Sequence, residues 1–407
     1  MSGSPYGNDP VSRLLNGQAV SPVPVAPVYE GLGPLEDFRH RLWWRKWRDR
    51  LDQANTEVLP LDYQTYLAVE LEIRTDILEG PYPPPTWMHL SENSSQEDVA
   101  GCAIVRRGEE LYWLNEQGEA SWIAPSLRAK EEQLTAEKVY RWTMRWDKGG
   151  DPEALDKVPQ IPQHALQPIP EPASGQAETW SRSTRYDAAR ALQARYRDRL
   201  ALYVAYGTPF NNVWDVLGFQ KTMYALVEQP KAMHRLLEER LPRPSARFTG
   251  ERLLGAGVIH VEDCMSSADL ISPEMYREFA FPYTKQMLEF FEKLGFRTVL
   301  YFSGNLMPLL NQLKELPFTA LAFEEDRKGY GIDLAEVRRV MGPDRVLFGN
   351  IDASFLETAS DEQVLAEVRR QVDVAGPDNF IVSPGSPMTP GTSLERVRLF
   401  LESTQRL

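Results

Sequence analysis

Short apolar runs alternate with longer amphipathic segments along the second half of the chain. The apolar runs have strand length and lie at 201–206, 257–261, 298–302, 319–323, 345–348 and 379–382. The segments with helical length and periodicity lie at 272–294, 306–316, 333–341, 361–375 and 394–404. Strict alternation of strands and helices predicts parallel strands joined by helical crossovers.

This alternation predicts an α/β fold, namely a (β/α)8 TIM barrel with an N-terminal extension and a small β insertion. At least two further strands are expected before residue 200, one of them at 23–29. Ser272 followed by Pro273 predicts a helix start, and Thr392 with Glu395 predicts a capping box. An open doubly wound sheet gives the same alternation and remains the alternative.

The chain is expected to divide into a flexible N-terminal arm over 1–20 and one barrel domain over 21–407. A short helix in the arm should end near Asn16-Gly17. Glycine turns at 107–108 and 117–118 predict a small β insertion at about 100–125. A proline-rich stretch at about 151–175 predicts a surface connection or a lid.

Composition and charge exclude several classes of protein. Apolar residues form 42% of the 407 residues, which is typical of a globular core. The net charge of −13 argues against a nucleic-acid partner, because phosphate binding requires a basic face. No apolar run has bilayer-spanning length and the N-terminus lacks a signal pattern, so we expect a cytoplasmic protein without a membrane partner. The basic, Trp-rich segment 39–50 suits an amphipathic helix with a solvated basic side.

The chemistry is expected at the carboxyl ends of the strands, where barrel enzymes place their active sites. Polar residues beside a glycine or proline follow nearly every predicted strand, a mixture that suits a substrate loop. The adjacent acids Glu262 and Asp263 are the candidates for catalysis, and strand geometry turns only one of them toward the site. The candidates for substrate binding are Tyr206, Tyr301, Ser303, Asn305, Glu324, Asn350, Asp352 and Ser386.

Some of these residues also fit purely structural roles. Asn350 and Asp352 are suited to cap the helix that begins near Ser354. His260, Glu262 and Cys264 share one strand face and are residue types that bind zinc. Donors spaced two apart along a strand converge poorly on one ion, so we expect no metal there.

At the same strand ends the chain resembles the uroporphyrinogen decarboxylase superfamily, which includes the porphyrinogen decarboxylase and cobalamin-dependent methyltransferases. The resemblance rests on Glu262-Asp263, on 270–279 with Pro282, and on 303–305, 349–352 and 384–387. The opening segments 15–17 and 23–27 also look like the family's first segment. The resemblance covers most of the chain and implies the barrel fold.

The sequence departs from both of these subfamilies. The zinc ligands of the zinc-dependent methyltransferases fall on Tyr301, Ser303 and Ser386, and a hydroxyl is a poor replacement for a thiolate. The arginine signature with which the decarboxylase holds its substrate's carboxylates falls on 28–33, which contains no arginine. Its final-loop histidine also falls on Ser386. The resemblance therefore implies no bound zinc and no clamp for a porphyrinogen.

The resemblance implies a zinc-independent methyltransferase that demethylates a small molecule and works with a corrinoid (cobalamin) on a separate carrier protein. Asp263 or Glu262 would orient the substrate or act as general acid. Tyr301, Ser303, Asn350 and Ser386 would shape the pocket. Two alternatives are a cofactor-free decarboxylase-like lyase and a barrel that binds a ligand without catalysis. The family also makes a homodimer a reasonable expectation.

Overall fold

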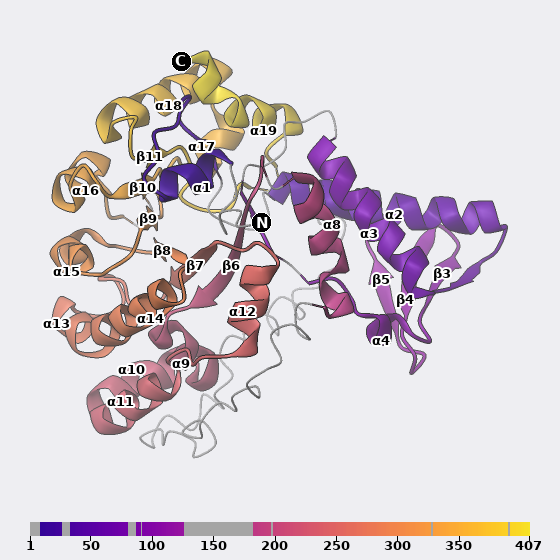
Figure 1. Cartoon of the computed structure of the whole chain (residues 1–407), viewed down its shortest axis with the longest axis horizontal. Helices are drawn as coiled ribbons and strands as arrows, with labels where there is room; N and C mark the ends of the chain where they lie inside the picture. Colours follow the sequence, from indigo (N-terminus) through magenta and orange to yellow (C-terminus); the bar gives the residue numbers. More distant parts are fainter. Residues whose placement is uncertain are drawn as a thin grey trace.

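A computed structural model describes residues 9–26, 33–79, 87–90, 92–125, 182–196, 198–326, 329–389 and 391–407, with the side chains of 33–38 left out. Two lobes stand side by side in Figure 1. We call the larger one the barrel lobe, which holds a curled parallel sheet, and the smaller one the side lobe. The predicted arm residues 1–8, the end of the first predicted strand at 27–29 and the proline-rich stretch 151–175 lie outside the described residues.

The sheet of the barrel lobe has seven parallel strands in the order β11-β10-β9-β8-β7-β6-β2. These strands are β2 (Trp87–His89), β6 (Ala201–Gly207), β7 (Val258–Asp263), β8 (Arg297–Phe302), β9 (Ala320–Phe323), β10 (Val346–Phe348) and β11 (Phe380–Ile381). A parallel bridge between Val25 and Val382 adds an extended segment beside β11. The six strands predicted after residue 200 are thus confirmed as parallel neighbours. In the described residues the sheet is a curled part of a barrel, and full closure of eight strands is not seen.

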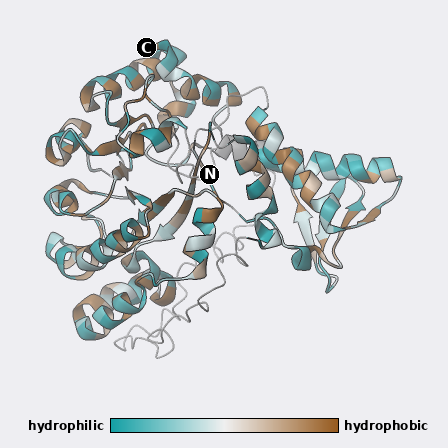
Figure 2. Ribbon diagram, viewed as in Figure 1, coloured by the Kyte–Doolittle hydropathy of each residue, from teal (hydrophilic) through white to brown (hydrophobic). Residues whose placement is uncertain are grey.

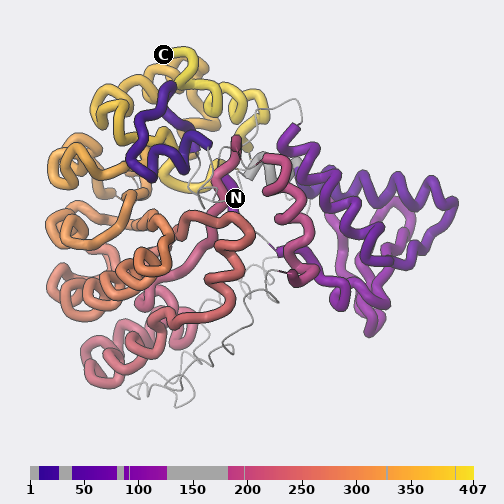
Figure 3. The backbone as a smooth tube through the Cα atoms, viewed as in Figure 1, coloured from indigo at the N-terminus to yellow at the C-terminus, as the bar shows by residue number. Residues whose placement is uncertain are grey.

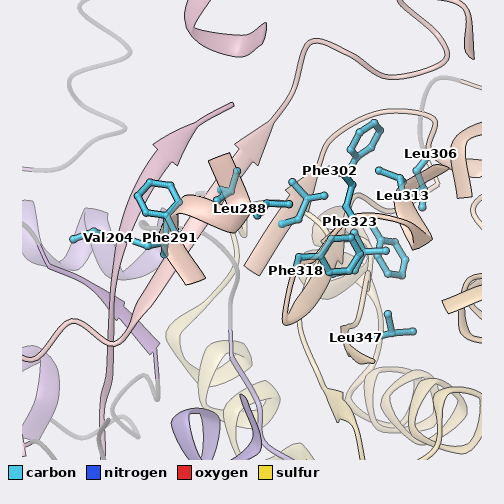
Figure 4. Close-up of a cluster of buried hydrophobic side chains, with 14 of the residues drawn as sticks. Val204, Leu288, Phe291, Phe302, Leu306, Leu313, Phe318, Phe323 and Leu347 are labelled. Atoms are coloured by element: carbon cyan, nitrogen blue, oxygen red, sulfur yellow. The ribbon is translucent and has the colours of Figure 1, made fainter. Parts of the chain in front are cut away.

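Alternate residues of each strand face opposite sides of the sheet, and both sides are apolar. The inner face of the curl carries Trp87, Ala201, Tyr203, Val258, Val299, Tyr301, Ala320, Ala322, Val346, Phe348 and Ile381. The outer face packs against helices: Figure 4 shows Phe302, Phe323 and Leu347 of the strands among Leu288, Phe291 and Leu313 of the helices. Burial on both faces explains why these strands read as continuous apolar runs rather than as alternating ones.

Helices cover the outer face of the sheet, as Figure 3 shows. They are α9 (Pro209–Leu217), α10 (Phe219–Glu228), α11 (Pro230–Glu239), α12 (Ala246–Leu253), α13 (Pro273–Met275), α14 (Phe281–Lys293), α15 (Leu310–Lys314), α16 (Leu334–Met341), α17 (Ala353–Thr358), α18 (Asp361–Ala375) and α19 (Leu394–Leu401), with the short 3-10 helices η5 (Met307–Leu309) and η6 (Ser403–Arg406). The predicted helix at 272–294 is interrupted by a π-helix, η4 (Tyr276–Ala280). Ser272 caps α13 as predicted. The capping box predicted at Thr392 is wrong by one residue, because Ser393 accepts from the Arg396 amide and caps α19.

The short helix α1 (Pro10–Leu15) closes the amino ends of the strands. Asp9 caps it by accepting from the Ser12 amide at 2.8 Å. Its apolar residues Val11, Leu14 and Leu15 are buried against the inner face of the sheet. The predicted helix near Asn16 is therefore confirmed, but it belongs to the core of the barrel lobe and not to a flexible arm.

The side lobe has its own apolar core. It comprises α2 (Gly33–Ala54), α3 (Tyr63–Glu79), α4 (Gln96–Val99) and an antiparallel sheet of β1 (Val58–Pro60), β3 (Ala103–Arg107), β4 (Glu110–Leu114) and β5 (Ala120–Ile123), while η3 (Thr184–Tyr186) and α8 (Asp187–Tyr196) join it to the barrel lobe. The predicted β insertion is thus present within a larger unit. Trp47 is fully buried, the Trp43 indole donates to Glu70 at 2.8 Å, and Arg50 pairs with Glu72. This confirms the amphipathic reading of segment 39–50.

Hydrophobic and hydrophilic residues are mixed along the helices of both lobes in Figure 2. In the described part of the chain, no helix combines the length and the apolar character needed to cross a bilayer.

The packing of α1 makes a testable contribution to stability. Leu14→Ala should lower the free energy of unfolding by about 2–5 kcal/mol, because it leaves a cavity in the inner core. Leu253→Ala on α12, where Leu253 is 57% exposed, is the control and should change stability by less than about 0.5 kcal/mol. Urea unfolding of both variants measures the difference. Equal stabilities would mean that α1 is not part of the core.

Candidate functional site

Strand β7 places a carboxylate on the inner side of the curled sheet, near the carboxyl end of the strand. Val258 lies on the inner face, so His260 and Glu262 follow it there, while Ile259, Val261 and Asp263 face the helices. The His260 Nδ1 atom lies 3.5 Å from Glu262 Oε1. The Glu262 side chain is 28% exposed, so solvent reaches it, whereas His260 is buried below it.

Aromatic rings form the floor beneath Glu262. Trp87 stacks on Tyr203 with ring centroids 4.5 Å apart, and Tyr203 lies 5.5 Å from His260. His260 in turn stacks on Tyr301 at 5.7 Å, and Phe348 lies 5.7 Å from Trp87. These contacts link rings from five strands into one layer, which we call the aromatic floor.

Solvent enters the inner side of the sheet above this floor. Ala205 pairs in register with His260 and lies on the same strand face as Tyr203, yet it is partly exposed. His89, at the end of β2, is also partly exposed and lies 5.4 Å from the Tyr203 ring. Solvent therefore reaches the inner side at the carboxyl ends of β2, β6 and β7, and we call this solvent-reached place beside Glu262 the opening.

Two buried glutamates follow β9 at the rim of the opening. Glu324 Oε2 accepts from the Gly304 amide at 2.9 Å and from the Tyr330 hydroxyl at 3.4 Å. Glu325 Oε1 accepts from Ser386 Oγ at 2.8 Å. The structure therefore brings the predicted residues Glu324 and Ser386 together, and it adds Glu325 between them.

The last loop packs directly on these glutamates. A Cβ atom at Gly385 would collide with the backbone nitrogen of Glu325, so only glycine fits there. The Tyr301 hydroxyl donates to the Gly385 carbonyl at 2.8 Å. The contact joins the aromatic floor to the final loop and places Tyr301 next to Ser386.

Asn350 is buried and holds the rim together rather than capping a helix. Its side-chain amide donates to the Glu324 carbonyl at 3.3 Å, and its carbonyl accepts from Gln371 Nε2 at 3.3 Å. Asp352 has the capping role instead, because it accepts from the amides of Ser354 and Phe355 at the start of α17.

Asp263 faces the helices and not the opening. It is fully buried, and its Oδ1 accepts from the Ser266 hydroxyl at 2.7 Å and amide at 3.2 Å. Burial raises the pKa of Asp263 from 3.8 to about 6, and the hydrogen bonds from Ser266 lower it only in part. The charge of Asp263 also contributes to raising the pKa of the buried Tyr276 hydroxyl, for which burial is the larger cause.

The loop that Asp263 anchors supports the next loop along the rim. The Ala268 amide donates to the Asn305 carbonyl at 3.0 Å, and the Asn305 amide donates to Asp269 Oδ1 at 2.7 Å. Gly304 lies between these contacts, has φ +93° and donates to Glu324. Asp263 is thus placed to position Glu324 through two loops. The Asn305 side chain accepts from the Met307 amide, so it stabilises its own turn.

Tyr206 lies on the outer face, away from Glu262. Its ring packs against Phe248 and Phe291, and the Arg247 guanidinium lies 5.0 Å from its centroid. Arg247 Nε donates to Glu251 Oε1 at 2.8 Å, and burial raises the pKa of Glu251. The ion pair of Arg247 and Glu251 was not predicted from the sequence. Its only signals in the sequence were the two apolar residues beside Arg247 and the spacing of four residues between Arg247 and Glu251, which makes them neighbours on a helix.

Sequence reasoning also missed His89. His89 lies two residues after Trp87, whose ring is on the inner face, so both residues belong to the same face of the strand. The strand has only three residues, which are too few to show the two-residue alternation of inner and outer positions. The other predicted site residues separate into three groups. Glu262, Tyr301, Glu324, Asn350 and Ser386 lie around the inner opening and its rim. Ser303 follows β8, and its amide donates to the Asp263 carbonyl at 2.9 Å. Tyr206, Asp263, Asn305 and Asp352 serve the surrounding structure.

The donors at the opening do not suit zinc. The positions of the zinc ligands in the resembling methyltransferases hold Tyr301, Ser303 and Ser386, whose phenol and hydroxyl groups are weak zinc ligands. Ser386 and Tyr301 also direct these groups to Glu325 and Gly385. Within the described ranges, no three His, Cys, Asp or Glu side chains gather closely enough to hold a metal ion.

Comparison with known proteins points to one family. The family model described as uroporphyrinogen decarboxylase (URO-D) matches residues 152–407. Uroporphyrinogen decarboxylase 2, chloroplastic, of Arabidopsis thaliana is 27% identical over 229 residues, which cover 54% of this chain and 56% of the relative. Methylcobamide:CoM methyltransferase MtaA of Methanosarcina barkeri is 30% identical over 145 residues, which cover 35% and 40%. The chain spans about half the length of the curated relatives it matches.

A solved structure supports the fold over nearly the whole chain. A methyltransferase from Methanosarcina mazei matches with a TM-score of 0.56 and covers 98% of this chain and 99% of its own. The sequence identity is 17%, so this likeness concerns the fold alone.

The burial of Asp263 predicts a distinct pH dependence. The folded-state pKa of about 6 lies above the unfolded value, so the protonated form is favoured by folding and stability falls as pH rises from about 4 to about 7. Asp263→Asn removes this pH-dependent contribution to the free energy of unfolding. The free energy of unfolding of the variant relative to wild type should therefore rise by about 3 kcal/mol over that interval. Urea unfolding across the pH range measures it, and a pH-independent difference would refute the burial argument.

The close packing of Gly385 predicts a specific loss. Gly385→Ala should lower the free energy of unfolding by about 1–3 kcal/mol and displace Ser386 from Glu325, because the added methyl group meets backbone atoms. Gly331→Ala is the matched control, because Gly331, like Gly385, lies outside the left-handed region and a Cβ there would meet only Asp326 Oδ2 at 3.9 Å. Thermal unfolding measures both. A loss at Gly385 no greater than at Gly331 would contradict this close packing.

Proposed function

The chain belongs to the uroporphyrinogen decarboxylase (URO-D) family, and from this we propose that it is an enzyme with its active site at the opening beside Glu262. We extend the proposal to the fold: a complete (β/α)8 barrel, in which the segment around Val25 also meets β2. The parallel bridge from Val25 to Val382 and the inner position of α1 support closure.

The reaction we propose is methyl transfer from a methylated small molecule to a corrinoid carried by another protein. The methyltransferase among the relatives supports this class. The observation that carries the proposal is the acidic opening, where Glu262 stands over the aromatic floor with Glu324 and Glu325 at the rim. The corrinoid, in its reduced form, supplies the electron pair that takes the methyl group.

This chain's own residues would bind and orient the methylated atom. Glu262 is the accessible carboxylate over the floor, so it would contact the heteroatom that bears the methyl group. When that atom leaves as an anion, Glu262 would donate the proton it needs. Tyr301, Ser303, Asn350 and Ser386 would shape the opening, and Asp263 would act as a positioning residue through the loop at Ser266.

We propose that the reaction needs no zinc. Tyr301, Ser303 and Ser386 offer a phenol and two hydroxyl groups, which activate no thiol acceptor through zinc. A corrinoid acceptor is itself the nucleophile, so a metal-bound thiolate has no part in the step. A homodimer and a cytoplasmic location remain proposals drawn from the family and from the composition.

Decarboxylation is the second candidate, because several relatives are uroporphyrinogen decarboxylases. The acidic rim argues against it. Glu262, Glu324 and Glu325 border the opening, and a substrate with many carboxylates would meet like charges there. A barrel that binds a ligand without catalysis is the outcome if neither reaction is found.

Anaerobic methyl transfer to chemically reduced cobalamin, followed by its absorbance, tests the proposal. A panel of methyl ethers, methylamines and methyl onium compounds should contain at least one donor. With that donor, Glu262→Gln should lower kcat/KM at least about tenfold, whereas the exposed control Glu109→Gln should stay within about threefold.

Preincubation with a zinc chelator should leave the rate unchanged. Turnover of coproporphyrinogen or uroporphyrinogen without any methyl transfer would instead establish the decarboxylase reaction. Loss of methyl transfer on chelation would contradict the zinc-independent chemistry.

A further inference from the structure

We propose that the outer face of the side-lobe sheet is a docking site for the chain's own proline-rich segment 158–172. This segment lies outside the described residues, and its docking is independent of the reaction at the opening. Three features support the assignment: an apolar row that crosses the sheet, a partly exposed tryptophan in that row, and the position of the segment in the chain.

One row of apolar side chains crosses the outer face of the sheet from edge to edge. The register aligns one residue from each of β1, β3, β4 and β5, namely Val58, Val105, Tyr112 and Trp122. The next residues along the strands, such as Ile104 and Trp113, belong to the other face and to the core under α2 and α3. Val58 is 48% exposed, and the other three residues of the row are partly exposed. The row is therefore an apolar surface of the side lobe and not part of its core.

Trp122 offers both a ring face and a hydrogen-bond donor at the edge of the sheet. Among the described residues, no ring stacks on Trp122 and no acceptor takes its indole N–H. Tyr112 beside it is held at one end, because its hydroxyl donates to Glu110 and the Arg107 guanidinium lies 5.1 Å from its ring centroid. Domains that recognise proline-rich peptides use exposed aromatic rings of this kind, and an indole N–H supplies their polar contact.

The spacing of the row matches a proline-rich ligand. Proline fixes φ near −65°, so proline-rich segments favour the polyproline II helix, which repeats every three residues, or about 9.3 Å. Alternate strands of a sheet are about 9.6 Å apart, so residues three apart on the ligand meet alternate strands of the row. Segment 158–172 contains five prolines, and Pro159 and Pro162 are three apart. The polyproline II helix has no internal hydrogen bonds, so its carbonyls are free to accept from Trp122.

The chain keeps the segment within reach of this face. The described residues end at Pro125, two residues after β5, and continue at 182, two residues before η3. Arg185 of η3 pairs with Asp98 of α4 at 2.9 Å, and α4 leads into β3. The ten residues 173–182 can extend over about 33–36 Å, whereas four strands are only about 19 Å wide. Both connections of the segment therefore start in the lobe that carries the row.

The size of the face favours a tethered segment over a second copy of the chain. Strand β1 has three residues, so four strands about 4.8 Å apart give a face of roughly 200 Å². A stable complex of separate proteins buries about 800 Å² on each partner. A tethered segment is present at about millimolar effective concentration, so a small contact is enough to hold it.

Binding of a synthetic peptide to the full-length protein tests the proposal. A five-proline variant, with every proline of 158–172 changed to alanine, leaves the face free. A fluorescein-labelled peptide with the native sequence of 158–172 should bind this variant at least about tenfold more tightly than wild type, whose face is occupied. Fluorescence anisotropy measures the binding.

Three further substitutions, each made in the five-proline variant, locate the peptide. Trp122→Ala and Val58→Lys, at opposite edges of the row, should each weaken peptide binding at least about fivefold. Tyr224→Ala on α10 of the barrel lobe, where Tyr224 is 49% exposed, is the control and should leave binding unchanged. Thermal unfolding checks that each variant keeps the fold.

Other results overturn the proposal. Equal peptide binding by wild type and the five-proline variant would show that the chain's own segment does not occupy the face. Absence of binding to the five-proline variant would exclude a proline-rich ligand. Binding that survives both Trp122→Ala and Val58→Lys would place the peptide elsewhere. A dimer that Val58→Lys separates in size-exclusion chromatography would assign the face to a second copy instead.

Discussion

The alternation of side chains along β7 is the constraint on which the site depends. Because successive residues of a strand point to opposite faces, His260 and Glu262 enter the curl and Asp263 is forced into the helix layer. The parallel register with β6 and β8 then fixes the neighbours of Glu262, namely Gly207 and Tyr301. One strand thus separates two adjacent acids into an accessible group and a buried structural group.

The rim is built by contacts between loops and not by any single motif. Gly304 can donate to Glu324 only because its neighbours are held by Asp269 and by the loop that Asp263 anchors. Gly385 brings the last loop onto Glu325, which places Ser386 within hydrogen-bond distance. Burying several carboxylates in this way costs free energy, which a site devoted only to stability would avoid. We interpret the retained acids as serving the ligand.

Much of the fold could be read from the sequence because both faces of the parallel sheet are apolar. The runs at 298–302 and 319–323 match β8 and β9 within one residue, and Ser272 caps its helix as expected. The size of the side lobe was underestimated, because the apolar residues of its helices α2 and α3 contact each other and a small sheet, and not the barrel sheet. Periodicity alone does not tell which surface a helix meets.

The candidate site was predicted only in part, for physical reasons that particular residues show. Strand geometry indicated that one of Glu262 and Asp263 faces inward, but the phase of β7 is fixed by its pairing with β6 and β8, which the sequence does not reveal. Asp352 and Asn350 stand two apart after the same strand, yet the first caps α17 and the second is buried against Gln371. Three-dimensional context decides between such roles. A crystal structure of the protein with a bound methyl donor tests the central claim most directly. We expect electron density for the methylated atom inside the curl, in contact with Glu262 and above Tyr203 and His260. Density on the outer side of β7, next to Asp263, or between the two lobes would contradict it.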